Sequence, residues 1–311
     1  MHASPRHRIL NVVQSALLLA GMAAIGWVIL STVAGPALAL ALVAGTVGGL
    51  LFAPRIPSRV LLGAYKARRL TGREFPEGVT ILAELARRAG LPRVPELYYV
   101  PSRMPNAFAM GHPEDSVVCI SDGLLRLLNR RELAGVLAHE VAHIAHRDLW
   151  VMGLADAMSR AVSLASWIGQ LIFLVNLPLI LAGAAHVPWI VPLLLIFSPT
   201  IMALLQLALS RTREYDADHG GAALTGDPES LASALLKLER RTGRFWEEMF
   251  LPGRRIPEPS LLRTHPRTEE RIRRLRELAG PTRPQPANGA VRIPVVMRVD
   301  APRFGPWGVY R

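Results

Sequence analysis

The segment LAHEVAHIAH at residues 137–146 contains the pattern His-Glu-x-x-His, with histidines at His139 and His143. Asn129 followed by Glu132 forms a capping box, which predicts that a helix begins there and continues through the segment. Apolar residues recur along it at helical spacing, namely Leu133, Val136, Leu137, Val141 and Ile144. Because four residues are slightly more than one helical turn, both histidines project from one face of this helix.

Two imidazoles on one helix face can bind a single zinc ion. Glu140 sits beside that face, where its carboxylate can take a proton from zinc-bound water. The alternative is a pair of surface histidines on an exposed helix. The helix is markedly apolar, however, and unpaired His and Glu side chains buried in it would be costly. The pattern therefore favours one zinc ion per chain, bound by His139 and His143, with Glu140 as the general base.

A catalytic zinc site needs a third protein ligand and keeps one position open for water. The candidate is Glu214, in the segment SRTREYDADH at residues 210–219. Asp218 follows one helical turn later on the same face, where it can hold the outer nitrogen of a ligand histidine. The alternative for this segment is a charged helix with ordinary salt bridges to Arg211 and Arg213.

Two long blocks of the chain contain no Asp, Glu, Lys or Arg, namely residues 9–54 and 161–210. Each is long enough for two membrane-spanning helices joined by a turn. We expect a first hairpin at residues 9–52 that turns near residues 31–35. The second hairpin, at residues 161–209, turns near His186. Four prolines make this second hairpin the less regular one, so that it spans the bilayer fully or only enters it.

Basic residues flank both hairpins, whereas neither turn carries a Lys or Arg. By the positive-inside rule, both termini and the sequence between the hairpins face the cytosol. The short basic start resembles that of a signal peptide, but the apolar run that follows is longer than the hydrophobic region of a typical signal peptide. We therefore expect an uncleaved anchor in a multi-pass protein of the cell membrane.

The formal net charge of +12 does not indicate a nucleic-acid partner. Nearly all of the positive charge is arginine, much of it beside the apolar blocks, where anionic headgroups attract it. No basic motif with interleaved aromatic residues is present. The single cysteine, Cys119, cannot form an internal disulfide, which suits a reducing compartment.

The remaining chain is predicted to be an α+β domain. Alternation predicts short strands at residues 96–100, 107–110 and 116–121, and helices are expected at residues 76–90, from Pro228, and at 268–278. The expected division is a hairpin at 1–54, a cytosolic domain in two parts at 55–160 and 211–280 around a second hairpin at 161–210, and a tail at 281–311. Pro, Gly and Arg dominate this tail, so it is predicted to be flexible or loosely docked, with a possible strand at 291–299.

The segment HEVAHIAHRD, the second hairpin and the segment SRTREYDAD together resemble the HtpX family of membrane-bound zinc peptidases, which are gluzincins related to the CAAX prenyl proteases. The resemblance extends from the first hairpin to about Leu278. It implies a zincin-like fold in which His139, His143 and Glu214 bind zinc and Glu140 is the general base. It also implies misfolded or damaged membrane proteins as substrates, a role in protein quality control and the stress response.

Two further segments resemble the family. Asn106 and Ala107 lie in a strand that, in related zincins, is an edge strand that pairs with an extended substrate, although Phe108 would also suit an ordinary core strand. His265, in a Thr-His-Pro segment, is expected either to donate to the developing oxyanion or to occupy the open zinc position. A helix-capping role for His265 is the alternative.

The sequence thus predicts a membrane-embedded zinc endopeptidase. Its expected partners are the lipid bilayer and unfolded or membrane-protein substrates, and its oligomeric state is not indicated. One alternative is a membrane scaffold or sensor that keeps zinc for structure only, which the intact Glu140 argues against. The other is an enzyme that processes lipid-modified peptides.

Overall fold

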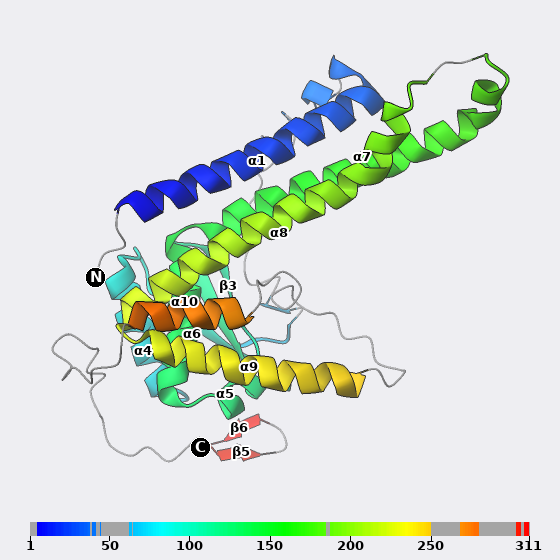
Figure 1. The fold of residues 1–311 in the computed structure, drawn as a ribbon. Helices are drawn as coiled ribbons and strands as arrows, with labels where there is room; N and C mark the ends of the chain where they lie inside the picture. The colour runs from blue at the N-terminus through cyan, green and yellow to red at the C-terminus, as the bar shows by residue number, and fades with distance from the viewer. Residues whose placement is uncertain are drawn as a thin grey trace. The chain divides into compact units, whose positions relative to one another are not determined.

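The computed structural model describes residues 5–37, 39–41, 44, 62–63, 65–184, 187–249, 268–279, 303–305 and 308–310 (Figure 1). The chain divides into two compact units. Unit 1 comprises Met1–Ala3, Ile56–Leu149 and Arg213–Arg311, and unit 2 comprises Ser4–Arg55 and Trp150–Thr212. Both membrane-type blocks of the sequence therefore belong mainly to unit 2, and the His-Glu-x-x-His segment belongs to unit 1.

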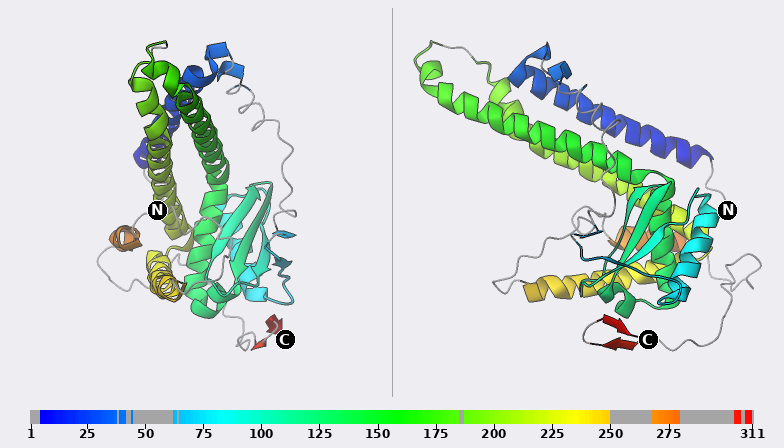
Figure 2. Two further views of the ribbon diagram at one scale, coloured as in Figure 1. Left: turned by 90° about the vertical axis from the view of Figure 1, so that its right-hand side faces the viewer. Right: turned by 180° about the vertical axis from the view of Figure 1, so that it is seen from behind.

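Unit 2 is built from three long helices, which are α1 (Pro5–Ala34) and most of α7 (Asp148–Leu181) and α8 (Ile190–Thr225). Each is long and apolar enough to cross a bilayer. The three helices share one apolar cluster centred on Met22, Val162 and Met202 and lie side by side (Figure 2). The first hairpin turns where expected, since α1 ends at Ala34 and Gly35 has φ +80°. Most of its predicted second helix lies outside the described residues.

The second hairpin is more regular than its prolines suggested. Pro199 lies inside α8 and cannot donate the hydrogen bond that the carbonyl of Leu195 would otherwise accept. The hydroxyl of Ser166 and the side-chain amide of Gln170, both on α7, donate to that carbonyl, the amide over 2.9 Å. Because partner groups from a neighbouring helix satisfy the freed backbone, a proline is tolerated at this depth. Both helices also extend further than predicted, with α7 beginning at Asp148.

Unit 1 contains a four-stranded sheet in the order β1-β2-β4-β3. Strand β2 (Glu96–Val100) runs parallel to β4 (Asp115–Ser121), and β3 (Ala107–His112) runs antiparallel to β4. These are the three predicted strands. The fourth, β1 (Arg68–Arg69), was not predicted because it has only two residues, both charged and exposed. The order leaves β3 at one edge of the sheet.

Five helices complete the well-described part of unit 1 (Figures 1 and 2). They are α4 (Pro76–Ala89), α5 (Asp122–Leu127), α6 (Arg130–Ala145), α9 (Pro228–Met249) and α10 (Thr268–Ala279). Helix α6 packs against α4, α9 and the sheet. The predicted fold class, an α+β domain combined with membrane helices, is confirmed. Of the predicted tail, the structure describes only β5 (Arg303–Gly305) and β6 (Gly308–Tyr310), which pair with each other.

Helix α6 is the centre of unit 1. It begins at the predicted cap, where the Asn129 side chain accepts from the Glu132 backbone and the Glu132 carboxylate accepts from the Asn129 backbone. Every residue from Glu132 to Ile144 is buried. A helix that is buried on all sides normally carries apolar residues around its whole circumference. The polar residues of α6 therefore need partners inside the protein, and these partners define the site.

Candidate metal centre

The structure brings His139, His143 and Glu214 together although 71 residues separate the second histidine from the glutamate in sequence. One ligand atom from each of the three lies within 4.8 Å of the others. The three residues are 5%, 9% and 5% exposed. The alternative of two surface histidines is therefore wrong. A buried group of two imidazoles and one carboxylate is a donor set typical of catalytic zinc sites.

Two glycines allow α8 to approach α6 closely enough to form this group. A Cβ atom at Gly221 would lie 3.0 Å from the backbone nitrogen of His139, and one at Gly220 would lie 2.8 Å from the Cβ of Ala142. Both glycines follow Glu214 in α8, on the stretch that contacts the His-Glu-x-x-His segment. The absence of side chains at these positions therefore sets the distance between the helix faces that carry His139 and Glu214.

The outer nitrogen of His139 faces Asp218, with Nδ1 3.1 Å from Oδ1. Arg271 of α10 forms a bidentate ion pair with Asp218, in which Nε donates to Oδ2 over 2.7 Å and Nη2 donates to Oδ1 over 2.6 Å. Arg271 also lies 3.1 Å from Oε2 of Glu214, measured from Nη1. Asp218 thus occupies the position expected for a carboxylate that orients a ligand histidine. Arg271 was not among the predicted site residues.

The outer nitrogen of His143 has an equivalent partner, Asp148, which the sequence analysis missed. Nδ1 of His143 donates to Oδ2 of Asp148 over 2.8 Å, and Oδ1 of Asp148 lies 3.3 Å from Nη1 of Arg213. The contact depends on a sharp turn, in which α6 ends at Ala145 and Arg147 adopts φ +58°. This left-handed residue turns the chain so that the first residue of α7 reaches back to the histidine.

The charges around the three ligands suit a divalent cation. With neutral histidines, the four carboxylates of Glu214, Asp148, Asp218 and Glu140 and the two guanidinium groups of Arg271 and Arg213 leave two negative charges around the three residues. Burial lowers the pKa of His143, but the hydrogen bonds to Asp148 and Glu214 outweigh burial and hold this pKa well above its usual value. The pKa of His139 is raised in the same way by Asp218 and Glu214. The cluster thus stabilises positive charge at the ring nitrogens, as a metal site requires.

Glu140 follows His139 directly in α6 and is 4% exposed. Burial, with a contribution from the charge of Glu140, raises the pKa of the Cys119 thiol of β4 to about 12. Cys119 is therefore a packing residue and has no nucleophilic thiolate at neutral pH. Burial lowers the pKa of Arg271, but the charges of Asp218 and Glu214 and, as a smaller contribution, that of Glu140 outweigh burial and raise this pKa.

Of the two predicted substrate-binding residues, Ala107 begins β3 and Asn106 immediately precedes it. The Asn106 backbone is held by Ser121, whose hydroxyl accepts from the Asn106 amide over 2.8 Å. Ala107 is buried in the core. In the described part of the sheet, β3 pairs only with β4, so its other edge is available for a further strand. His265 lies outside the described residues.

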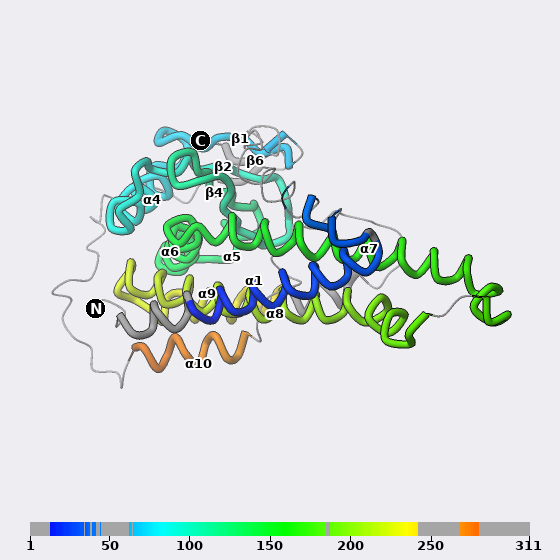
Figure 3. The backbone as a smooth tube through the Cα atoms, turned by 90° about the horizontal axis from the view of Figure 1, so that it is seen from above, coloured from blue at the N-terminus to red at the C-terminus, as the bar shows by residue number. Residues whose placement is uncertain are grey.

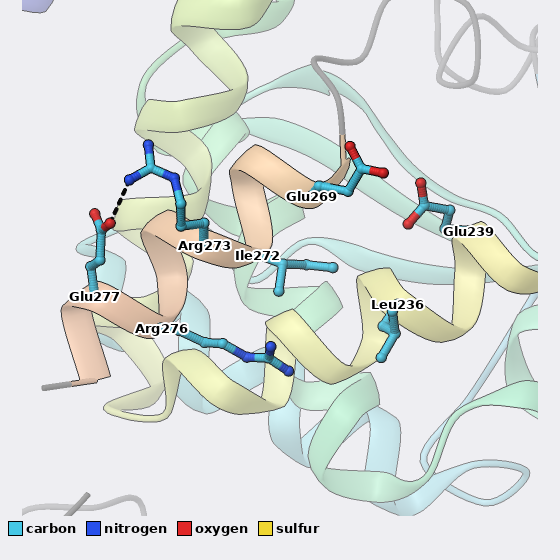
Figure 4. Close-up of a pocket in the computed structure, with 7 residues that line it drawn as sticks. All are labelled: Leu236, Glu239, Glu269, Ile272, Arg273, Arg276 and Glu277. Carbon is cyan, nitrogen blue, oxygen red and sulfur yellow. Dashed lines mark hydrogen bonds and ion pairs between the residues drawn. The ribbon is translucent and has the colours of Figure 1, made fainter. Parts of the chain in front are cut away.

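A groove of about 720 Å³ lies between α9 and α10, which run alongside each other (Figures 3 and 4). Leu236 and Ile272 are its apolar residues, and charged residues of both helices line the rest. Arg273 pairs with Glu277 across 2.6 Å at its margin. His139, His143 and Glu214 do not line this groove, so it is a surface feature separate from the candidate metal centre.

Comparison with known proteins places these residues in a family context. Residues 73–279 match the model of peptidase family M48. A protein named Protease HtpX homolog from Thermococcus kodakarensis is 40% identical over 233 residues, covering 71% of this chain and 80% of the relative. One of the same name from Desulfatibacillum aliphaticivorans is 37% identical over 287 residues, covering 85% and 89%. The crystal structure of S. mikatae Ste24p superposes with a TM-score of 0.44 at 18% identity over 88% of this chain and 66% of that one, which is too weak to support an argument.

Proposed function

The chain belongs to peptidase family M48 and is a membrane metalloprotease, and we propose that it is a zinc endopeptidase with Glu140 as its general base. His139, His143 and Glu214 would hold the ion. The observation that carries this proposal is the convergence of these three buried side chains, with a further buried carboxylate, that of Glu140, next to His139 in sequence and not among them. A zinc site that served structure alone would have no use for that acid.

The chain's own residues divide the work of peptide hydrolysis. When bound, zinc would acidify a water molecule and polarise the peptide carbonyl. Glu140 accepts the proton of the attacking water and delivers it to the leaving amine. Asp218 and Asp148 orient His139 and His143, because Oδ2 of Asp148 accepts from Nδ1 of His143 and Oδ1 of Asp218 lies 3.1 Å from Nδ1 of His139.

The substrates we propose are unfolded or damaged membrane proteins. The edge of β3 that pairs with no strand among the described residues can pair with the backbone of an extended peptide and needs no particular side-chain sequence. A tightly folded protein cannot present such a strand. The three apolar helices keep the enzyme in the bilayer, and the basic flanks of the hairpins favour a cytosolic active site.

The test is a comparison of the wild-type protein with Glu140→Gln in detergent, with the zinc content of each determined. We expect both proteins to bind about one zinc ion. The variant should cleave an unfolded model substrate about 100- to 10,000-fold more slowly, because the general base is lost. Glu277→Gln on the exposed face of α10 is the matched control and should retain full activity.

Three results would contradict different parts of the proposal. Wild-type protein without zinc would remove the metal centre itself. Zinc-loaded wild type that cleaves neither unfolded nor membrane-protein substrates would favour the scaffold. Cleavage only of lipid-modified peptides would keep the enzyme and change its substrate class.

A further inference from the structure

Helix α10 places one buried guanidinium between two carboxylates of the metal centre. Arg271 is 4% exposed and contacts both Glu214, a ligand, and Asp218, which orients His139. Its Nε and Nη2 atoms lie 2.7 and 2.6 Å from the two oxygens of Asp218, and Nη1 lies 3.1 Å from Glu214. One planar group therefore spans a ligand and the group that orients a second ligand.

These two carboxylates need such a partner. Glu214 and Asp218 are four residues apart in α8 and project from the same face, where like charges repel each other. Both are about 95% buried, so water cannot screen the repulsion. Without a cation between them, each would turn away from the other and from the histidine it faces.

Other residues of α10 fix the position of Arg271. Ile272 and Leu275 are buried in the core of unit 1. The guanidinium of Arg274 lies 3.9 Å from the centre of the Tyr215 ring, next to Glu214 in sequence. Arg271 therefore reaches Glu214 and Asp218 from a helix that is held to α8 and α9 by separate contacts.

We propose that Arg271 is a positioning residue of the metal centre, which holds Glu214 and Asp218 in the arrangement that binds the ion and does not contact the substrate. The proposal rests on the proposed function, since it assumes that Glu214 is a zinc ligand. It adds α10, a helix without any ligand of its own, to the parts of the fold that determine metal affinity.

Positioning and simple charge make opposite predictions for this residue. Removing a positive charge beside the ligands would by itself strengthen the attraction for a cation. Removing the guanidinium that orients the two carboxylates would weaken zinc binding. The loss of an orienting contact of a metal ligand typically weakens metal binding about 10- to 100-fold. The sign of the change in zinc affinity therefore separates the two roles.

The experiment measures the zinc dissociation constant by competition with a chromophoric chelator for the full-length protein in detergent. Arg271→Met should raise this constant about 10- to 100-fold. At saturating zinc, the KM of this variant for an unfolded substrate should stay within about twofold of wild type, because Arg271 makes no contact with the substrate. Arg273→Gln, on the exposed face of the same helix, is the control and should leave both values unchanged.

Arg271→Lys covers the case in which the Met variant does not fold. It keeps the charge but loses the planar fork, so it should also bind zinc more weakly than wild type. Unchanged or tighter zinc binding in either variant would overturn the proposal, as would a raised KM with unchanged zinc affinity. Those results would leave the proposed function intact, whereas wild-type protein without zinc would end both.

Discussion

The two sides of the metal centre are built alike but from different parts of the fold. On one side, His139 faces Asp218, which pairs with Arg271 of α10. On the other side, His143 donates to Asp148, whose second oxygen faces Arg213. Each of the two histidines therefore faces an aspartate, which in turn contacts an arginine.

The difference lies in how each aspartate reaches its histidine. Asp218 is placed by helical spacing, one turn after the ligand Glu214 in the same helix. Asp148 is the first residue of α7 and is placed by the turn between α6 and α7. Arg213 lies in α8, three residues after the end of the uncharged block at residue 210. The side of His143 thus depends on the ends of two helices that continue into unit 2, whereas the side of His139 depends on α10.

The largest effect should come from Asp218→Asn compared with Asp148→Asn. Asp218→Asn leaves Arg271 buried without one of its carboxylates, which we expect to cost about 3–5 kcal/mol of folding free energy. Asp148→Asn should cost less, about 1–3 kcal/mol, because Asp148 makes a single, longer contact of 3.3 Å with Arg213, whose side chain is 11% exposed. Thermal unfolding in detergent measures both.

The zinc affinity of the same two variants provides a second measurement. Both variants lose the orienting contact of one ligand histidine, so both should bind zinc about 10- to 100-fold more weakly. Similar losses of zinc affinity with unequal losses of stability would show that the two aspartates orient their histidines equally but contribute unequally to the stability of the fold. Equal losses of stability would mean that the two arginines are equally dependent on their aspartates.

A second, smaller effect is expected from Gly221→Ala, which tests the His139 side alone. The new Cβ would lie 3.0 Å from the His139 nitrogen and 3.2 Å from its Cα, both backbone atoms that cannot move independently. Overpacking of this kind costs about 1–3 kcal/mol. Gly153→Ala, where no atom lies within 4 Å of the added Cβ, is the control and should be neutral or slightly stabilising. Equal unfolding temperatures for the two variants would show that α8 can shift away without loss.

The same contrast explains what the sequence could and could not predict. His139 and His143 are one helical turn apart, as are Glu214 and Asp218, and Glu140 follows His139 directly, so a correct helix assignment places each side chain on a face. The ligand Glu214 came from the charged segment that follows the second apolar block. Helical periodicity carries no information about Asp148, because the left-handed Arg147 interrupts it.

Arg271 illustrates a second limit. It lies in an amphipathic helix with five arginines and glutamates on its exposed faces, which are Glu269, Glu277, Arg273, Arg274 and Arg276. The family resemblance includes Arg271 and Ile272 after the Thr-His-Pro segment, but the amphipathic pattern of the helix gives no reason to bury this arginine and expose the others. The burial follows from tertiary packing, since Ile272 and Leu275 face the core and place the neighbouring Arg271 toward α8. The order of the strands and the short β1 were beyond sequence reasoning for the same reason.

Glu132 supplies a test of the helix that both sides share. Burial raises the pKa of its carboxyl, but contacts with Lys237, Asn129 and Ser233 outweigh burial and leave the pKa below its ordinary value of 4.5. Its ionised form therefore stabilises the fold fully above about pH 4.5, and this stability is lost as the pH falls from there toward the lowered pKa. Glu132→Gln should cost about 1–2 kcal/mol at pH 7.

The measurement is the difference in unfolding temperature between wild type and Glu132→Gln from pH 7 down to pH 3.5. The difference should shrink below about pH 4.5, the ordinary value, because only the wild type loses the contribution there. Titration of the metal-site histidines is common to both proteins and cancels. A difference that stays constant over this range would contradict a role for the ionised carboxylate.

The smallest effect should come from the turn that places Asp148. Arg147 has φ +58° and its guanidinium lies 3.8 Å from the exposed Glu114, a pair that contributes little. Arg147→Val puts a β-branched residue in the left-handed region and should cost about 1–2 kcal/mol, whereas Arg147→Gly removes the steric penalty and should be neutral or stabilising. Zinc affinity should fall in the Val variant only, since a displaced turn withdraws Asp148 from His143. If both variants bind zinc as wild type does, the turn does not control the carboxylate, and the two sides of the centre differ less than their construction implies.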